Sequence, residues 1–232
     1  MSGRCYAEDL PSEQWTGRAA CSKPIPEGDR LVFDAILRRR IDPPVDRLAS
    51  ALASLGVPAN AVTVAGLVIG LGAAVAIALG SPLAGLGLIL TSRLCDGLDG
   101  AIAKRTRPTD LGGYLDIVFD FVFYGAIPLA FAVLDQTQNA LPAAVLLLTF
   151  YANGASFLAY AILAEKREIT TQVRGKKTFF FTTGLAEASE TIIAFCLFCL
   201  FPAWFPVIAY VFAAMTAWTF VARVWLAVRT FG

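Results

Sequence analysis

The strongest constraint on this chain is a series of long stretches without any charged side chain. Ala61–Gly80 and Gln136–Ala164 contain no Asp, Glu, Lys or Arg. Both are at least as long as the roughly 20 residues that an α-helix needs to cross the hydrocarbon core of a bilayer. Only 16% of the 232 residues are charged, whereas soluble domains have about 25%. The sequence therefore predicts an all-α integral membrane protein.

The distribution of apolar and basic residues predicts six transmembrane helices with both termini in the cytoplasm. The nineteen Lys and Arg residues lie in the N-terminal region, in two of the links, at the C-terminal end, or at Arg93 near one end of a span. The links that would face outward carry none, which is the positive-inside pattern and requires an even number of spans. The six spans are expected at Asn60–Gly80, Pro82–Thr106, Asp110–Leu134, Ala140–Lys166, Thr178–Phe201 and Trp204–Arg229.

Two shorter regions precede this predicted six-helix domain of residues 57–232. Residues 1–28 are polar and lack an apolar core, which predicts a mobile tail and not a signal peptide. Residues 29–56 are amphipathic, and we expect an interfacial helix that Gly56 ends. An ordinary helix packed on the rest of the protein is the alternative. In the second half of residues 29–56, apolar residues repeat with helical spacing at Val45, Leu48, Ala49, Leu52 and Leu55.

The residue types present limit the chemistry. The chain has no histidine, which excludes a His general base, a His-assisted nucleophile and a His metal site. The five cysteines are an odd number without a disulfide spacing, and we expect free thiols. The net charge of +1 gives no reason to expect a nucleic-acid partner. Carboxylates are left to carry any acid–base or metal chemistry.

Four aspartates flank one short link between two spans. Asp96 and Asp99 are i, i+3 near the end of the second span, and Asp116 and Asp120 are i, i+4 in the first turns of the third. Each pair shares a helix face, and the short link predicts antiparallel neighbouring helices, so the four carboxylates should converge. A carboxylate in the middle of a span costs at least ~2.5–3.5 kcal/mol, so it needs a function or a partner.

Divalent cations are the expected partners of these acids. Hard cations with oxygen ligands, Mg²⁺ or Mn²⁺, relieve the repulsion among clustered carboxylates. Basic residues follow one to two turns beyond the acids, where they can meet phosphate, and nearby glycines leave room for a bulky ligand. These residues are Lys104, Arg105 and Arg107, with Gly97, Gly100, Gly112 and Gly113. The group predicts phosphoryl chemistry. The alternative is that the acids pair with Arg93, Lys104 and Arg105 as interhelical salt bridges.

Residues 96–120 read DGLDGAIAKRTRPTDLGGYLDIVFD and resemble the signature of the CDP-alcohol phosphotransferase (CDP-alcohol phosphatidyltransferase) family, D-x-x-D-G-x-x-A-R-x8-G-x3-D-x3-D. Lys104 stands where the family usually has Arg, and only seven residues separate it from Gly112, so Arg105 is a second candidate for that role. Two weaker resemblances are Asn60-x-x-Thr63 to the family's P-N-x-x-T, and Gly175-Lys176-Lys177-Thr178 to its G-K-x-K-T.

The resemblance implies a phosphatidyltransferase of phospholipid biosynthesis in the cytoplasmic membrane, with its active site facing the cytoplasm. It would move the phosphatidyl group of CDP-diacylglycerol to the hydroxyl of a small polar acceptor and release CMP. It implies a two-ion metal centre, with Asp96, Asp99 and Asp116 as metal ligands and Asp120 as ligand and catalytic base. A homodimer is also implied. The implied donor-binding residues are Gly100, Ala103, Lys104, Arg105, Gly112, Asn60 and Thr63.

The acceptor site stays open at this stage. Glu187 and Glu190 can line an acceptor pocket for a cationic group, or pair with Arg223, Arg93 or hydroxyl groups. The basic residues before the fifth span can hold an acceptor phosphate, or serve topology and anionic headgroups. These basic residues are Arg174, Lys176 and Lys177.

Three other functions compete with the leading one. A CDP-amino-alcohol phosphotransferase that acts on diacylglycerol would use the same signature with a soluble donor. A divalent-cation transporter lined by the acids belongs to another class, but most of the first, fourth and sixth spans is apolar and offers it no path. The third is a membrane scaffold without activity.

Overall fold

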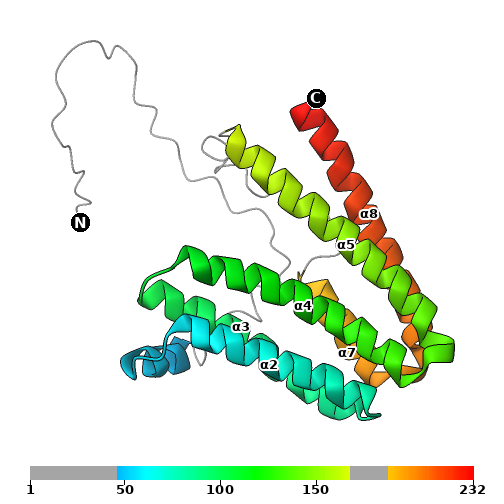
Figure 1. The fold of residues 1–232 in the computed structure, drawn as a ribbon, viewed down its shortest axis with the longest axis horizontal. Helices are drawn as coiled ribbons and strands as arrows, with labels where there is room; N and C mark the ends of the chain where they lie inside the picture. Colours follow the sequence, from blue (N-terminus) through cyan, green and yellow to red (C-terminus); the bar gives the residue numbers. More distant parts are fainter. Residues whose placement is uncertain (1–45, 168–187) are drawn as a thin grey trace, which may run out of the picture. The chain divides into compact units, whose positions relative to one another are not determined.

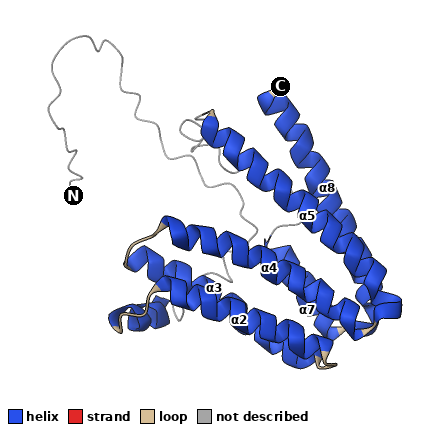
Figure 2. Cartoon of the chain, viewed as in Figure 1, coloured by secondary structure: helices blue, strands red, loops and turns tan. Residues whose placement is uncertain are grey.

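The computed structural model describes residues 46–167 and 188–232, and all the regular structure in these two ranges is helical. Figure 1 shows the order of the helices along the chain, and Figure 2 shows helices and loops without strands in the described part. The predicted all-α class is confirmed. The helices are α2 (Ala59–Ala78), α3 (Pro82–Arg105), α4 (Asp110–Leu134), α5 (Gln136–Lys166), α7 (Ala188–Leu200), the 3₁₀ helix η1 (Pro202–Trp204) and α8 (Phe205–Phe231).

The helices lie where the sequence predicts spans. The first three begin and end within two residues of the prediction, whereas α5 begins at Gln136, four residues before the predicted start. The fifth predicted span is described only from Ala188 onward. The predicted tail, the amphipathic segment before residue 46 and the residues Arg174, Lys176, Lys177 and Glu187 lie outside the described residues.

Four of the described segments are long and apolar enough to cross a membrane: α2, α4, α5 and residues Pro202–Phe231. Helix α3 has 24 residues, enough to cross, but it carries the charges of Arg93, Asp96, Asp99, Lys104 and Arg105. Large apolar side chains are exposed along the helices, as they are in proteins whose outer surface faces lipid. The chain is an integral membrane protein.

Local sequence signals explain where the helices begin and end. The Thr109 side chain accepts a hydrogen bond from the Gly112 N–H at 3.0 Å and caps the start of α4. Asp135 caps α5 in the same way, by accepting from the Gln138 N–H at 3.1 Å. Gly80 has a positive φ of 86° directly after α2, a conformation that glycine adopts without steric penalty and that commonly ends helices.

Aromatic rings form the centre of the helix packing. Helix α2 packs against α3 and α4, α5 packs against α4 and α8, and α7 packs against α3 and α8. Phe131 of α4 stacks on Phe205 of α8 with ring centroids 4.7 Å apart, and Phe198 of α7 meets the same ring edge-on at 4.8 Å. All three rings are fully buried. Such close packing drives helix association in lipid, where water is absent.

A short helix over residues 46–54 lies against the ends of α2 and α3. Ala49 is fully buried and packs with Val62 and Leu98, whereas Leu48 and Leu55 of the predicted apolar stripe are exposed. The described half of the amphipathic segment therefore contacts protein with one side, as the alternative interpretation expected, and leaves apolar side chains free on another. Gly56 has a φ of 74° and ends this helix as predicted.

We predict that Gly70→Ala destabilises the protein. A Cβ atom at Gly70 would lie 2.7 Å from Phe123 Cδ2 and 3.0 Å from Ser92 Oγ, so the buried ring would have to move. Overpacking of this kind costs about 1–3 kcal/mol in the free energy of unfolding. Thermal unfolding in detergent should show a lower midpoint. Gly72→Ala is the matched control, because its Cβ would meet nothing within 4 Å; equal midpoints for the two variants would contradict the packing argument.

Candidate active site

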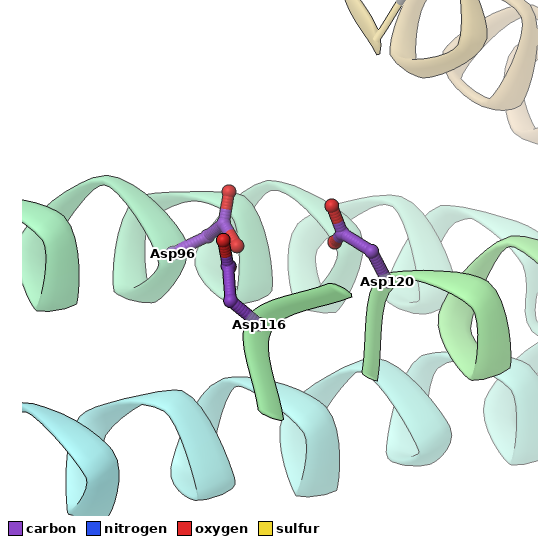
Figure 3. A group of neighbouring side chains, drawn as sticks. All are labelled: Asp96, Asp116 and Asp120. Atoms are coloured by element: carbon purple, nitrogen blue, oxygen red, sulfur yellow. The ribbon is translucent and has the colours of Figure 1, made fainter. Parts of the chain in front are cut away.

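Three carboxylates meet between α3 and α4. Asp116 and Asp120, one turn apart on α4, point the same way, and Asp96 reaches them from α3 (Figure 3). One oxygen from each of the three lies within 4.8 Å of the others. The three aspartates, called the carboxylate cluster from here on, confirm that the two helix faces converge. Like charges this close repel strongly unless a cation lies among them.

Asp99 belongs to the same cavity but not to this tight group. It lies on α3, is only 7% exposed, and its Oδ2 atom is buried without a hydrogen-bond partner in the part of the chain that the structure describes. A buried carboxylate oxygen without a donor is unfavourable unless a cation or another ligand approaches it. The cavity is lined by Thr63, Gly66, Leu67, Ser92, Arg93, Asp96, Asp99, Asp116, Phe119 and Asp120.

The oxygen donors of this cavity fit a hard divalent cation. Among the residues that the structure describes, four carboxylates and no nitrogen or sulfur ligand line it, which is the donor set that Mg²⁺ and Mn²⁺ prefer. Asp116 is exposed, and Asp96 and Asp120 are half-buried, so an ion and a ligand can enter from one side. The Oδ2 atom of Asp99 can add a further oxygen ligand, because it has no hydrogen-bond partner among the described residues.

In the described part of the chain, the side chain of Arg93 places a positive charge at the carboxylate cluster. Its Nη1 atom donates to Asp120 Oδ1 at 2.7 Å and lies 3.6 Å from Asp96 Oδ2. The guanidinium carbon lies 4.2 Å from the centre of the Phe123 ring. The interpretation of the acids as salt-bridge partners is therefore right for Arg93, and Arg93 engages two of the four.

Of the predicted donor-binding residues on α2 and α4, Thr63 lines the cavity, whereas Asn60 and Gly112 lie close to each other. The Thr63 hydroxyl donates within α2 to the Ala59 carbonyl at 3.1 Å. The Asn60 Oδ1 atom would be 3.0 Å from a Cβ added at Gly112. Gly112 thus permits the start of α4 to approach α2. A Cβ on Gly100 would meet nothing within 4 Å, so this side of α3 is open.

The two candidate basic residues at the end of α3 differ in their surroundings. Arg105 donates to Asp46 Oδ1 at 3.0 Å, which ties it to the short helix of residues 46–54. Lys104 is exposed, and Ala103 beside it is half-buried. In a helix of 3.6 residues per turn, Lys104 lies about 80° from Asp96, whereas Arg105 lies about 180° from it. Lys104 is therefore the one nearer to the face of the acids.

The acceptor-site candidates are only partly described. Glu190 lies in the first turn of α7 and is half-buried, and it does not line the cavity of the four aspartates. Arg223, a predicted partner of the glutamates, donates from α8 to Asn153 Oδ1 at 2.8 Å and to Ser156 Oγ at 3.2 Å on α5. Arg93, the other predicted partner, engages aspartates. The remaining candidates lie outside the described residues.

Sequence reasoning named Arg93 only in the alternative, as a salt-bridge partner of the acids, and did not assign Ser92 to the site. A signal for Arg93 was present, because it precedes Asp96 by three residues and so shares its helix face. Ser92 gave no such signal. Its fully buried hydroxyl donates to the Gly66 carbonyl at 2.8 Å, a contact that depends on how closely α2 and α3 approach.

The family follows from a comparison with known sequences. A model of the CDP-alcohol phosphatidyltransferase family matches residues 56–225. The chain belongs to this family. The matched range contains all four aspartates of the cavity, and the predicted resemblance is confirmed. The members of this family are transferases that move a substituted phosphate group from a CDP-alcohol.

Two curated relatives match this chain over different shares of their own length. The Inner membrane protein YnjF of Escherichia coli (strain K12) is 43% identical over 194 residues, which are 84% of this chain and 94% of that protein. The archaetidylinositol phosphate synthase of Methanothermobacter thermautotrophicus is 38% identical over 96 residues, 41% of this chain and 46% of that protein.

Solved structures share the fold. The phosphatidylinositol phosphate synthase of Mycobacterium tuberculosis, crystallised with CDP-DAG bound, matches with a TM-score of 0.59 at 22% identity. The match covers 80% of this chain and 92% of that chain. A second crystal structure of that synthase, in complex with manganese and citrate, matches with a TM-score of 0.58 at 22% identity, and covers 78% of this chain and 87% of that chain.

We predict that Asp116→Asn weakens the binding of divalent cations. The substitution removes one charge and one ligand oxygen from the carboxylate cluster, which should reduce Mn²⁺ affinity at least about tenfold. Titration calorimetry on detergent-purified protein measures this, after removal of metals with EDTA. Asp110→Asn is the control, because Asp110 is an exposed residue of the same helix that does not line the cavity. Equal affinities for both variants would argue against a metal site at the cluster.

Proposed function

We propose that this family member transfers the phosphatidyl group of CDP-diacylglycerol to the hydroxyl of a small polar acceptor, and releases CMP. The observation that carries the proposal is the convergence of Asp96, Asp116 and Asp120, with the buried oxygen of Asp99 beside them, in a cavity that can hold divalent cations. A diphosphate donor matches this site, because its charge is neutralised by the metal ions that the carboxylates hold.

Each aspartate has a part in this proposal. Asp96, Asp99 and Asp116 would hold Mg²⁺ or Mn²⁺, as two ions, and Asp120 would complete the ligand set. Bound there, the ions would supply positive charge to neutralise the diphosphate and the departing CMP. Asp120 accepts the proton of the acceptor hydroxyl, whose oxygen then bonds to the phosphorus that carries diacylglycerol. The bond from that phosphorus to the CMP oxygen breaks, and CMP leaves with the electron pair.

The proposed orientation places the site toward the cytoplasm. Six crossings with both termini in the cytoplasm bring the link between α3 and α4, with Lys104, Arg105 and Arg107, to the cytoplasmic side. Soluble acceptors and CMP then reach the site from that side, while the diacylglycerol chains stay among the helices. The homodimer expected from the resemblance is part of this proposal.

The acceptor is the variable part of the reaction. Two relatives are named as synthases of archaetidylinositol phosphate and phosphatidylinositol phosphate, so an inositol phosphate belongs in any panel of acceptors. Serine, glycerol 3-phosphate, inositol and choline represent the other charge types. The same assay tests the alternative donor, because a CDP-amino-alcohol with diacylglycerol would release CMP without CDP-diacylglycerol.

We predict CMP release from CDP-diacylglycerol and Mg²⁺ or Mn²⁺ with one member of this panel. Asp120→Asn should lower turnover at least about 100-fold, because it removes the proposed base, and should change donor binding only a few-fold. The readouts are labelled CMP release and binding of labelled donor in detergent. Unchanged turnover in Asp120→Asn would exclude it as the base, and silence of the wild-type protein with every donor and acceptor would contradict the proposed reaction.

We also predict that Lys104, and not Arg105, contacts the donor's diphosphate. Arg105 is paired with Asp46 and lies on the far side of α3 from Asp96. Lys104→Ala should raise the KM for CDP-diacylglycerol about tenfold, which corresponds to the loss of one charge-assisted hydrogen bond. Arg105→Ala and Asp46→Asn are the controls and should change this KM less than about threefold. A larger effect of Arg105→Ala than of Lys104→Ala would reverse the assignment.

A further inference from the structure

The side chain of Arg93 is largely buried, unlike that of an arginine that faces water or lipid headgroups. Its side chain is only 17% exposed, and its Nε atom is buried without a hydrogen-bond partner among the described residues. The guanidinium lies over the fully buried ring of Phe123. An arginine that had only to satisfy membrane topology would reach water or headgroups with its charge. Arg93 instead directs its charge into the cavity.

The contacts of Arg93 join two helices through their acids. Nη1 donates to Asp120 on α4 at 2.7 Å and lies 3.6 Å from Asp96 on its own helix. Nη2 is 3.5 Å from the Ser92 hydroxyl, at the limit of a hydrogen bond. In the protein alone, this guanidinium therefore offsets part of the repulsion within the carboxylate cluster. Its position against Phe123 adds a cation–π contact that holds it there.

A divalent cation at the carboxylate cluster needs the same acids. Asp96 and Asp120 are both members of the cluster and both partners of Arg93. A guanidinium that stays beside them repels the ion, and one that moves away gives up its bond to Asp120. Both outcomes make the free energy of metal binding less favourable. The charge on Arg93 thus stabilises the metal-free site and weakens metal binding at it.

We propose that Arg93 is the internal counter-cation of the carboxylate cluster. Its charge holds Asp96 and Asp120 together in the absence of metal, and it competes with a divalent ion for Asp120. The proposal rests on the metal centre proposed above. It makes Arg93 a positioning residue, since it acts on the acids and not on the substrate. A metal site with a competing internal cation releases its ion more readily than four unopposed carboxylates would.

The test measures Mn²⁺ affinity and thermal stability, without any substrate. Full-length protein in detergent is freed of metal with EDTA, and unfolding midpoints are recorded before calorimetric titration with Mn²⁺. Arg93→Met keeps an extended apolar side chain over Phe123 but removes the charge. We expect a midpoint several degrees lower than the wild-type value without metal, and about tenfold tighter Mn²⁺ binding. Arg93→Lys keeps the charge but loses the planar group over Phe123, and should bind Mn²⁺ less tightly than Arg93→Met does.

A matched control separates this effect from a general loss of charge. Arg105→Met removes a cation from the same helix whose partner is Asp46, outside the cavity, and should leave Mn²⁺ affinity unchanged. Unchanged or weaker Mn²⁺ binding by Arg93→Met would overturn the proposal, because Arg93 would then be neutral toward the ion or would orient its ligands. Wild-type protein that binds no Mn²⁺ would overturn the proposed metal centre as well, so the two failures are distinguishable.

A double variant covers the case in which Arg93→Met does not fold without metal. Arg93→Met combined with Asp120→Asn removes the cation together with its closest anion, so the metal-free double variant should be more stable than Arg93→Met alone. Such recovery measures the coupling between the two side chains. A double variant that is no more stable than the single one, in EDTA, would contradict the role of Arg93 as a counter-cation.

Discussion

The repulsion among closely spaced carboxylates is the constraint on which the rest of this structure depends. Asp96, Asp116 and Asp120 bring oxygens within 4.8 Å of one another between apolar helices, where charges are weakly screened. The helices that carry them must be held against this repulsion. Arg93 offsets it locally, and the packing of α2 against both α3 and α4 holds the helices from a second side. Close helix packing is therefore needed to offset the electrostatic repulsion among these aspartates.

Small residues on α2 make that packing possible. Gly66 and Gly70 are buried, and a Cβ on either would meet side chains of α3 or α4 within 3.2 Å. The Ser92 hydroxyl donates to the Gly66 carbonyl, so α2 also fixes α3 through its backbone. Close helix approach through glycine is a common means of association in lipid. Here it also sets the separation of the two helices whose acids form the site.

Much of this arrangement could be predicted from the sequence because it is local. Asp116 and Asp120 are one helical turn apart, and the link of a few residues before α4 brings Asp96 near them. Spacing alone therefore predicted that these three carboxylates converge, and the structure brings them together. Spacing offered Arg93 as a partner of the acids but could not identify Asp120 as its closest one, because that contact depends on the rotation of α3 against α4. The pairing of Arg105 with Asp46 depends on how the short helix of residues 46–54 docks, which spacing does not determine.

The ring of Phe123 links the charged site to the apolar interior. One contact of the ring is with the guanidinium of Arg93, and its edge-on partner, 5.9 Å away between centroids, is Phe195 of α7. Position 123 must therefore suit a cation and an aromatic core at once. Leucine or isoleucine would fill the interior but offer no π-face, and a polar residue could contact the cation but would not suit the apolar interior. An aromatic ring at position 123 suits both neighbours, and a change in α7 that displaces Phe195 would also reach the carboxylate cluster, because Phe123 contacts both Phe195 and Arg93.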